Sequence, residues 1–343
     1  MNDKNARRRG AHRAPRTVPT VMNDRNVGDV ERRRQILDRV LAGDPERNVR
    51  CDAAPVEHVF EEAAALADAR HLADAVFRDG FAIVRLAPES PTPPALYAAA
   101  AAFFARPDKW NFEWAARSDP DTRSGYRSTP FREFYELHPA HGPGAPPPPP
   151  LADVAAAWCA MCRRLSCALL DELARRGLCP PSAELLRDTD ASMLRVYRYR
   201  CGPLWRALRM RIGVGSHVDL GLVTVAPCGS RSGLELRPNG RREYVAVEPQ
   251  MGRDEVVVFF GSTLTWLSGG AVACAPHRVV RRTNEPPRLS APYFLRPAAD
   301  SDAAHRFMLH VRTRRRRKQA GLLGVVLGAR TPRPEPPPAR AYA

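Results

Sequence analysis

The sequence contains no long hydrophobic run and no apolar leader. Its longest apolar stretch toward the carboxyl end, residues 320–329, has ten residues, whereas a membrane-spanning helix needs about 20. The opening residues MNDKNAR lack the apolar segment of a secretory signal peptide. We therefore expect no membrane span, and we expect an intracellular protein of the cytoplasm.

Acidic residues are few relative to basic ones. The chain of 343 residues has 53 Lys and Arg against 37 Asp and Glu, which gives a net charge of +16. A polyanionic partner is therefore worth considering, but part of the excess lies in basic runs near the two ends, at residues 7–9, 32–34 and 312–318. Because such runs are usually solvated arms, nucleic acid is not expected as the main partner, and any binding of it would be through these basic arms.

A second C-x-x-C pair is also missing. The chain has eight cysteines, and without a leader they indicate free thiols in a reducing compartment. Cys159 and Cys162 form a lone C-x-x-C on a predicted helix, which is typical of buried thiols rather than of zinc or redox chemistry.

Proline, by contrast, is abundant. The 34 prolines cluster in the first fifty residues, in residues 139–150 and after residue 330. The five consecutive prolines within 139–150 predict an extended polyproline insert, for which a rigid loop is a better interpretation than a ligand for an SH3-like partner.

The periodic segments predict helices first and strands later. Apolar residues at helical spacing from about residue 61 to Asp79-Gly80 precede an apolar strand at 81–86, and further helices are predicted from about 94 to 105 and from 151 to Gly177. Beyond Asp190 the chain changes to short β-branched and aromatic runs separated by Gly, Pro and Asn turns. That pattern is typical of a sandwich or jelly roll.

Three residues within this β-rich part can act as metal ligands. His217 and Asp219 are two positions apart, so in an extended strand they point to the same face. His277 follows sixty residues later. A single His-x-Asp pair is usually a satisfied core pair, but two histidines and one carboxylate form the facial triad of non-haem Fe(II) oxygenases, which leaves coordination positions open.

Arg288 and Ser290 repeat the two-residue spacing. A planar guanidinium with a neighbouring hydroxyl suits a carboxylate, because the guanidinium can hold both oxygens and the hydroxyl adds a third hydrogen bond. Arginine in this apolar context would be costly to bury unless an anion faced it. The stretch therefore predicts a carboxylate site beside the metal site.

These residues lie within a longer pattern that resembles the isopenicillin N synthase-like branch of the Fe(II)/2-oxoglutarate-dependent dioxygenases. The agreement in order and spacing extends over about a hundred residues and covers segments 193–199, 217–225, 233–236, 244–249, 256–261, 264–270, 277–280 and 288–294. The chain departs from the family pattern at Ser262, at Cys274 and in segment 200–206. The last of these borders the substrate pocket in relatives.

The resemblance implies a set of site residues. His217, Asp219 and His277 would bind iron, Arg288 and Ser290 would hold the distal carboxylate of 2-oxoglutarate, and Tyr199 would also reach this co-substrate. It implies a mixed, mainly β fold, a double-stranded β-helix (jelly roll) with flanking N-terminal and C-terminal helices. Composition and resemblance together divide the chain into a basic, largely disordered arm (1–50), a helix and strand region (51–138), the proline-rich insert (139–150), a long helix (151–189), the jelly-roll core (190–300) and a C-terminal helix with a basic, proline-rich tail (301–343).

The activity that the resemblance implies is oxidation, by default hydroxylation, of a small organic substrate. The co-substrates would be O2 and 2-oxoglutarate, which is decarboxylated to succinate. Desaturation or ring closure, an oxidase of the same fold that uses no 2-oxoglutarate, and a non-catalytic binding module with basic arms are the alternatives. The sequence carries no signal for the oligomeric state or for the identity of the substrate.

Overall fold

The computed structural model describes residues 59–113, 124–139, 147–186, 191–200, 211–282 and 284–298. The chain divides into two compact units, residues 1–50 and 51–343, and every described element belongs to the second. The predicted N-terminal arm, most of the proline-rich insert and the predicted C-terminal helix and tail lie outside the described residues.

The first helical stripe of the sequence forms two helices rather than one. These are α2 (Glu62–Ala67) and α3 (Arg70–Asp79). Asp68 separates them, because its carboxylate accepts hydrogen bonds from the Arg70 backbone N–H at 3.0 Å and from the Arg70 Nη2 at 2.6 Å. The apolar periodicity runs on through this break and therefore could not reveal it. Helix α3 ends at Gly80, whose φ of 89° is in the left-handed region that favours glycine.

The strands form two sheets. In the large sheet the order is β1-β2-β10-β7-β13-β5-β4-β3, with β12 also paired to β5, and in the small sheet it is β6-β11-β8-β9. The strands of the large sheet are β1 (Val59–Glu61), β2 (Phe81–Arg85), β3 (Gly125–Ser128), β4 (Arg132–Leu137), β5 (Met193–Tyr199), β7 (Val223–Pro227), β10 (Glu255–Phe260), β12 (Arg288–Ser290) and β13 (Tyr293–Leu295). Those of the small sheet are β6 (Arg211–His217), β8 (Leu234–Leu236), β9 (Val245–Ala246) and β11 (His277–Arg282).

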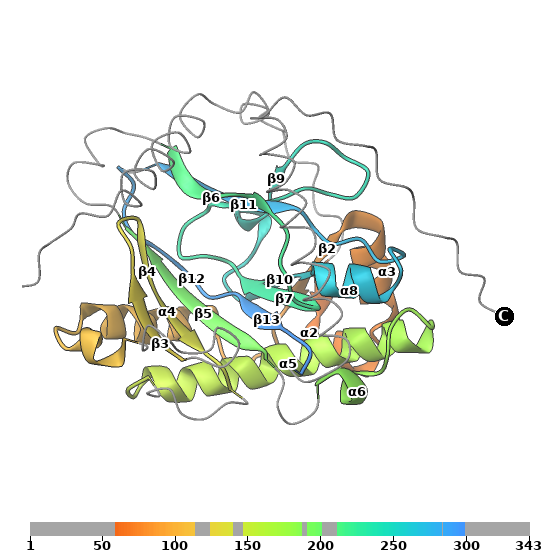
Figure 1. Ribbon diagram of the computed structural model, residues 1–343, viewed down its shortest axis with the longest axis horizontal. Helices are drawn as coiled ribbons and strands as arrows, with labels where there is room; N and C mark the ends of the chain where they lie inside the picture. Colours follow the sequence, from red (N-terminus) through yellow and green to blue (C-terminus); the bar gives the residue numbers. More distant parts are fainter. Residues whose placement is uncertain are drawn as a thin grey trace, which may run out of the picture. The chain divides into compact units, whose positions relative to one another are not determined.

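The two sheets face each other, and helices cover the other face of the large sheet (Figure 1). The predicted jelly roll with flanking N-terminal helices is thereby confirmed. Besides α2 and α3, the described helices are α4 (Pro93–Ala105), α5 (Leu151–Arg175), α6 (Ser182–Leu186) and α8 (Ser262–Leu267), with 3₁₀ turns η2 (Lys109–Phe112) and η3 (Glu248–Gln250). Helix α4 starts where the sequence predicts, because Thr92 caps it through a hydrogen bond from the Ala95 N–H and Pro93 occupies its first turn.

Successive side chains of a strand point to opposite faces of the sheet, and this divides the hydrophobic core into two clusters. On β10, Val256, Val258 and Phe260 pack with α5 in the larger cluster. Val257 and Phe259 on the opposite face pack with Leu234 and Leu236 of β8, between the two sheets. The face of the large sheet that is turned toward the small sheet is called the inner face below.

Helix α5 carries the apolar stripe predicted from the sequence. Trp158, Cys162 and Leu165 are fully buried. The thiols of Cys159 and Cys162 are buried, and burial raises the pKa of Cys162 well above its ordinary value, as the structural interpretation of this C-x-x-C requires. None of the helices in the described ranges has both the length and the apolar content needed to cross a bilayer.

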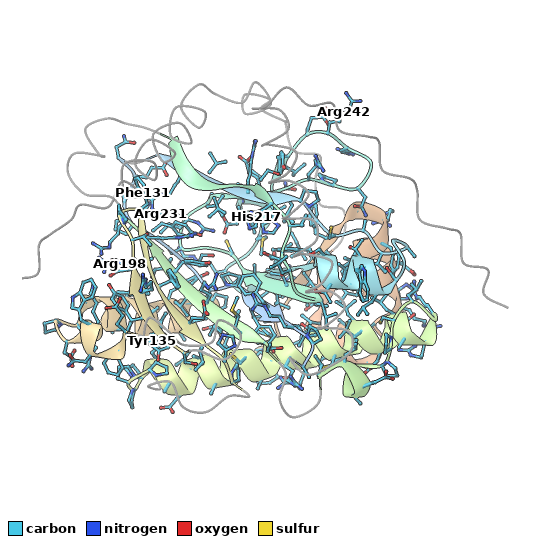
Figure 2. The ribbon with its side chains drawn as sticks, in the orientation of Figure 1. Phe131, Tyr135, Arg198, His217, Arg231 and Arg242 are labelled. Carbon is cyan, nitrogen blue, oxygen red and sulfur yellow. The ribbon has the colours of Figure 1, made fainter. Side chains whose placement is uncertain are left out.

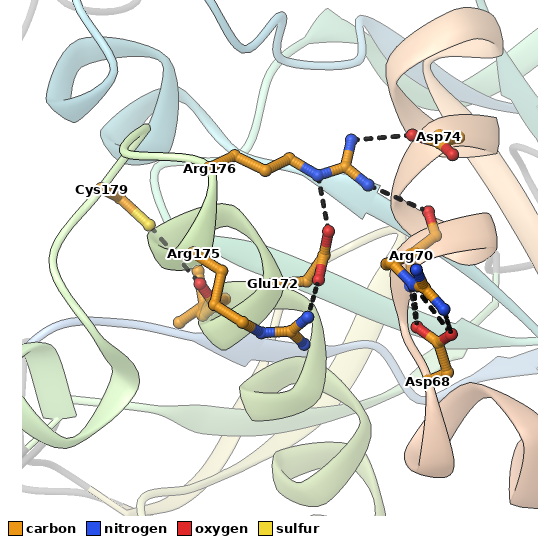
Figure 3. Close-up of polar contacts among 8 residues, drawn as sticks. Asp68, Arg70, Asp74, Glu172, Arg175, Arg176 and Cys179 are labelled. Atoms are coloured by element: carbon orange, nitrogen blue, oxygen red, sulfur yellow. Dashed lines mark hydrogen bonds and ion pairs between the residues drawn. The ribbon is translucent and has the colours of Figure 1, made fainter.

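A polar cluster joins α5 to α3 (Figure 3). Buried Glu172 pairs with Arg175 and accepts a hydrogen bond from the Arg176 Nε at 2.6 Å. Arg176 also reaches the Asp74 Oδ1 at 2.7 Å and the backbone carbonyl of Arg70 at 3.2 Å. The cluster fixes the C-terminal end of α5 against the N-terminal helices.

Candidate metal centre

The three predicted metal ligands come together between the sheets. His217 ends β6 and His277 begins β11, and the two residues are direct partners in the antiparallel register of these strands. Asp219 lies two residues beyond the end of β6. The ligand atoms of the three side chains all lie within 4.8 Å of one another, and the Asp219 Oδ1 is 3.8 Å from the His217 Nε2 and 3.6 Å from the His277 Nε2.

Backbone carbonyls orient both imidazoles. The His217 Nδ1 lies 2.8 Å from the carbonyl of Gly215, and the His277 Nδ1 lies 3.0 Å from the carbonyl of Ala275. An N–H on each Nδ1 leaves each Nε2 with a free lone pair directed at the other ligands, which is the arrangement seen in metal-binding histidines. Burial lowers the pKa of His277 and so favours the neutral imidazole that binds a metal.

The carboxylate of Asp219 is held with one oxygen free. The hydroxyl of Thr224 on β7 donates a 2.7 Å hydrogen bond to the Asp219 Oδ2, which leaves Oδ1 facing the imidazoles. The side chains of Asp219 and His277 are 9% and 7% exposed, whereas that of His217 is 39% exposed. Asp219 and His277 are therefore buried, and His217, which lies between the two sheets (Figure 2), is the exposed member of the centre.

The donor set fits a first-row divalent metal. Metal–ligand distances of about 2.1 Å place adjacent ligand atoms about 3 Å apart, so each side chain needs to move by less than about 1 Å from its present position. Two imidazole nitrogens and one carboxylate oxygen on a single face are the ligands of non-haem Fe(II) sites.

Two glycines allow the backbone to approach the centre closely. The N–H of Ser262 donates to the Asp219 carbonyl at 2.8 Å, and the Ser262 hydroxyl donates to the same carbonyl at 2.9 Å. A Cβ on Gly261 would lie 2.2 Å from the Gly221 carbonyl oxygen. Ser262, where the chain departs from the family pattern, thus holds the main chain of a predicted metal ligand.

Replacing Gly261 by alanine is expected to destabilise the protein by about 1–3 kcal/mol, because the added methyl group meets backbone atoms that cannot turn away. The same shift displaces Asp219 and weakens metal binding. Urea unfolding and a metal titration measure the two effects. Gly215→Ala is the matched control, since a Cβ there has no atom within 4 Å. Equal behaviour of the two variants would contradict this account.

Arg288, the predicted carboxylate ligand, is already paired with an anion of the protein. Its Nη2 lies 2.6 Å from the Oε1 of Glu248 in η3, and the two side chains are 2% and 1% exposed. The Arg288 Nε donates to the Arg231 carbonyl at 2.8 Å. The expectation that an anion faces Arg288 is met by Glu248, which sequence reasoning did not single out.

Glu248 also organises the turn beside Arg288. Its Oε1 accepts a hydrogen bond from the Gly229 N–H at 2.8 Å, and its Oε2 accepts from the N–H groups of Gly233 and Leu234 at 2.6 and 2.8 Å. Burial, the largest single influence, would lower the pKa of Arg288, but the charge of Glu248, its hydrogen bond and the nearby Tyr199 and Tyr97 together raise that pKa. A carboxylate inside the apolar run Val245–Pro249 was the available signal for this residue.

One donor of Arg288 remains for a ligand. Its Nη1 is buried and has no hydrogen-bond partner. Tyr199 pairs with Arg288 across β5 and β12, its ring centre lies 5.5 Å from the Arg288 Cζ, and burial raises the pKa of Tyr199 to about 12. Ser290 lies two residues further along β12 and is 9% exposed. These residues fit a carboxylate ligand, because a buried N–H without an acceptor is otherwise costly.

Comparisons with known proteins find matches in the part of the chain that contains these residues. Residues 191–297 match the family model of the 2OG-Fe(II) oxygenase superfamily. The chain is 33% identical over 110 residues to the oxidoreductase vrtI of Penicillium aethiopicum, which covers 32% of this chain and 25% of that protein. It is 38% identical over 89 residues to scopoletin 8-hydroxylase of Arabidopsis thaliana, which covers 26% and 24%. The matched part of the chain thus spans about a quarter of the length of these relatives.

The fold is shared with solved structures. A Neurospora crassa protein crystallised with alpha-KG and 5-formyluracil superposes with a TM-score of 0.56 at 21% identity, over 74% of this chain and 88% of that chain. At this identity the likeness shows the common fold.

Proposed function

Since residues 191–297 match the family model of the 2OG-Fe(II) oxygenase superfamily, we propose that the protein is an Fe(II)- and 2-oxoglutarate-dependent dioxygenase. It couples the oxidative decarboxylation of 2-oxoglutarate to succinate and CO2 with the oxidation, by default hydroxylation, of a small organic substrate. The observation that carries the proposal is the convergence of His217, Asp219 and His277 between the sheets.

His217, Asp219 and His277 hold Fe(II) through two imidazole nitrogens and one carboxylate oxygen. The bound iron supplies the activation of O2 that an unactivated C–H bond requires. The protein contributes orientation: the carbonyls of Gly215 and Ala275 hold the imidazoles, and Thr224 holds the carboxylate. The burial of Asp219 and His277 excludes water, and the exposed side of His217 admits substrate.

Arg288, Ser290 and Tyr199 bind the distal carboxylate of 2-oxoglutarate. The Nη1 of Arg288 donates to one carboxylate oxygen, and the two hydroxyl groups are further donors on the same inner face. Because the Arg288 Nη2 is already bonded to Glu248, this contact is made through Nη1 alone rather than through two guanidinium nitrogens.

Residues 190–300 form the catalytic core in this proposal, and residues 51–189 form its supporting layer. The substrate is a small organic molecule. The ligand named for the Neurospora crassa protein, 5-formyluracil, supports a substrate of this size class.

The test is anaerobic addition of Fe(II) and then 2-oxoglutarate to the purified protein. We expect the weak visible charge-transfer band of an iron-bound 2-oxo acid. His277→Ala is expected to abolish the band. Arg288→Lys is expected to weaken 2-oxoglutarate binding by about tenfold or more, because lysine keeps the charge opposite Glu248 but loses Nη1.

The two other outcomes of this titration would each indicate a different function. Bound iron with no band would exclude 2-oxoglutarate as co-substrate and indicate an oxidase of the same fold. Absence of iron binding at stoichiometric Fe(II) would exclude the enzyme and leave the non-catalytic binding module.

A further inference from the structure

The inner face of the large sheet extends beyond the metal centre. Thr224, which holds Asp219, is the register partner of Phe259 on β10 and of Phe294 on β13. Phe294 in turn pairs with Met193 at the start of β5. Because directly paired residues point to the same side of a sheet, Met193 lies on the same face as the residues that hold the metal ligands.

The same face continues along β5 to β4 and β12. Side chains alternate along a strand, so Arg195, Tyr197 and Tyr199 share the face of Met193, while Leu194 and Val196 pack with α5 on the other side. Tyr199 pairs with Arg132 on β4 and with Arg288 on β12. Tyr197 pairs with Phe134 and with Ser290. The strands lie side by side at one end of the sheet (Figure 1).

Rings and guanidinium groups alternate on this part of the face. The Arg132 Cζ lies 5.4 Å from the ring centre of Tyr197. The Tyr197 ring is stacked with that of Tyr199 at 5.4 Å and tilted against that of Phe134 at 5.5 Å. Phe134 is partly exposed, whereas Tyr197 is 8% exposed. The rings therefore form a firm apolar surface with one accessible member.

The three cations on this face are not equivalent. Arg195 donates to the Oε2 of buried Glu136 at 2.6 Å, and Arg288 donates to Glu248 at 2.6 Å. Arg132 stands against Tyr197 and interacts with Tyr199, and in the described ranges no carboxylate lies at ion-pair distance from it. Among the described residues Arg132 is thus a half-buried guanidinium without a counter-ion, beside two that are neutralised, and an anion would gain most by binding there.

We propose that Arg132, with Phe134 and Tyr197, forms the binding site for the prime substrate and that this substrate is a small aromatic carboxylic acid. The proposal rests on the proposed function, since it names the substrate class of the same site. The carboxylate of the substrate pairs with Arg132, and its planar ring packs on Phe134. The planar guanidinium matches a carboxylate with two parallel N–H bonds.

The position of Arg132 separates the substrate from the co-substrate. Arg132 and Arg288 lie on either side of β5, two strand spacings or roughly 10 Å apart, with Tyr199 between them. The co-substrate carboxylate and the substrate carboxylate thus bind to different guanidinium groups. Their mutual repulsion is reduced by this distance and by the intervening ring.

The experiment uses the full-length protein loaded with Mn(II) and saturated with 2-oxoglutarate, so that Arg288 is occupied. Calorimetry compares phenylacetate with two near-isosteres: phenylacetamide, which lacks the charge, and cyclohexylacetate, which lacks the planar ring. We expect phenylacetate to bind at least tenfold more tightly than either. Arg132→Gln should remove the preference for phenylacetate over phenylacetamide. It should leave the preference for the planar ring, measured as phenylacetate against cyclohexylacetate.

Arg242→Gln is the matched control, because Arg242 is an exposed arginine far along the chain from this face and its side chain extends into solvent in Figure 2. It should leave all three affinities unchanged. Retained 2-oxoglutarate binding shows that the Arg132→Gln protein is folded, and Arg132→Lys, which should restore part of the charge preference, gives a second check.

The proposal is overturned if phenylacetate does not bind, or if its preference over the amide survives in Arg132→Gln. These outcomes are distinct from a failure of the proposed function. That failure would appear earlier in the same titration, as a lack of 2-oxoglutarate binding to the metal-loaded protein.

Discussion

Replacing Glu248 by alanine is expected to lower the free energy of unfolding by about 3–5 kcal/mol, the range for breaking a buried ion pair. The change removes the partner of Arg288 and leaves a guanidinium that is 2% exposed without its charge partner. It also removes the acceptor of three backbone N–H groups, those of Gly229, Gly233 and Leu234. Equilibrium unfolding in urea measures the loss.

Two comparison variants serve as controls for this prediction. Glu248→Gln keeps the shape of the side chain but presents an amide N–H to backbone donors, so its stability should lie between those of the wild type and Glu248→Ala. Glu61→Ala breaks the exposed pair with Arg85 and should change stability little. A loss for Glu248→Ala as small as that for Glu61→Ala would show that the buried pair does not form in solution.

The thermal stability of Glu248→Ala should increase more than that of the wild type when 2-oxoglutarate is added. Once Glu248 is removed, both Nη1 and Nη2 of Arg288 can bind an anion, so 2-oxoglutarate should raise the melting temperature of Glu248→Ala by more than it raises that of the wild type. Ligand stabilisation grows with the ratio of ligand concentration to Kd. Equal shifts at matched concentrations would indicate that Glu248 does not limit the carboxylate site.

Replacing His277 by alanine is expected to reduce Fe(II) affinity by more than about 100-fold. Loss of a partner that merely holds a ligand typically costs 10–100-fold, and His277 supplies one of only three protein ligand atoms within 4.8 Å in the described chain. Thr224→Val should fall within the smaller range, because Asp219 remains but loses its 2.7 Å hydrogen bond. Anaerobic titration with Fe(II) against a competing chelator measures both affinities.

His71→Ala is the control for the metal titration, because His71 is an exposed histidine on α3 and is not among the three clustered side chains. It should bind Fe(II) like the wild type. If His277→Ala retained the wild-type affinity, the metal would have to bind elsewhere, and the assignment of this centre would be wrong. A similar melting temperature for the three variants without metal would show that the differences arise from ligation and not from unfolding.

The sequence by itself determined the local elements and the type of centre. Helical spacing of apolar residues located α5, because a helix that buries one face repeats them every three or four positions, and a continuous apolar run located β2. His217, Asp219 and His277 were recognisable because ligands of this kind have restricted chemistry and, within the His-x-Asp pair, fixed spacing. The break at Asp68 was not recognised, since one side chain with its own local hydrogen bonds overrode a continuous apolar stripe.

Only the tertiary structure decided which charges meet. Glu248 and Arg288 are forty positions apart, and their pairing depends on how η3 lies against β12. The row of Arg132, Tyr199 and Arg288 exists because β4, β5 and β12 are aligned in one register, and a shift by one residue would turn each side chain to the opposite face. Register and sheet packing are collective properties of many strands. No short stretch of the sequence contains them, and they determine which cation of the inner face is left for a ligand.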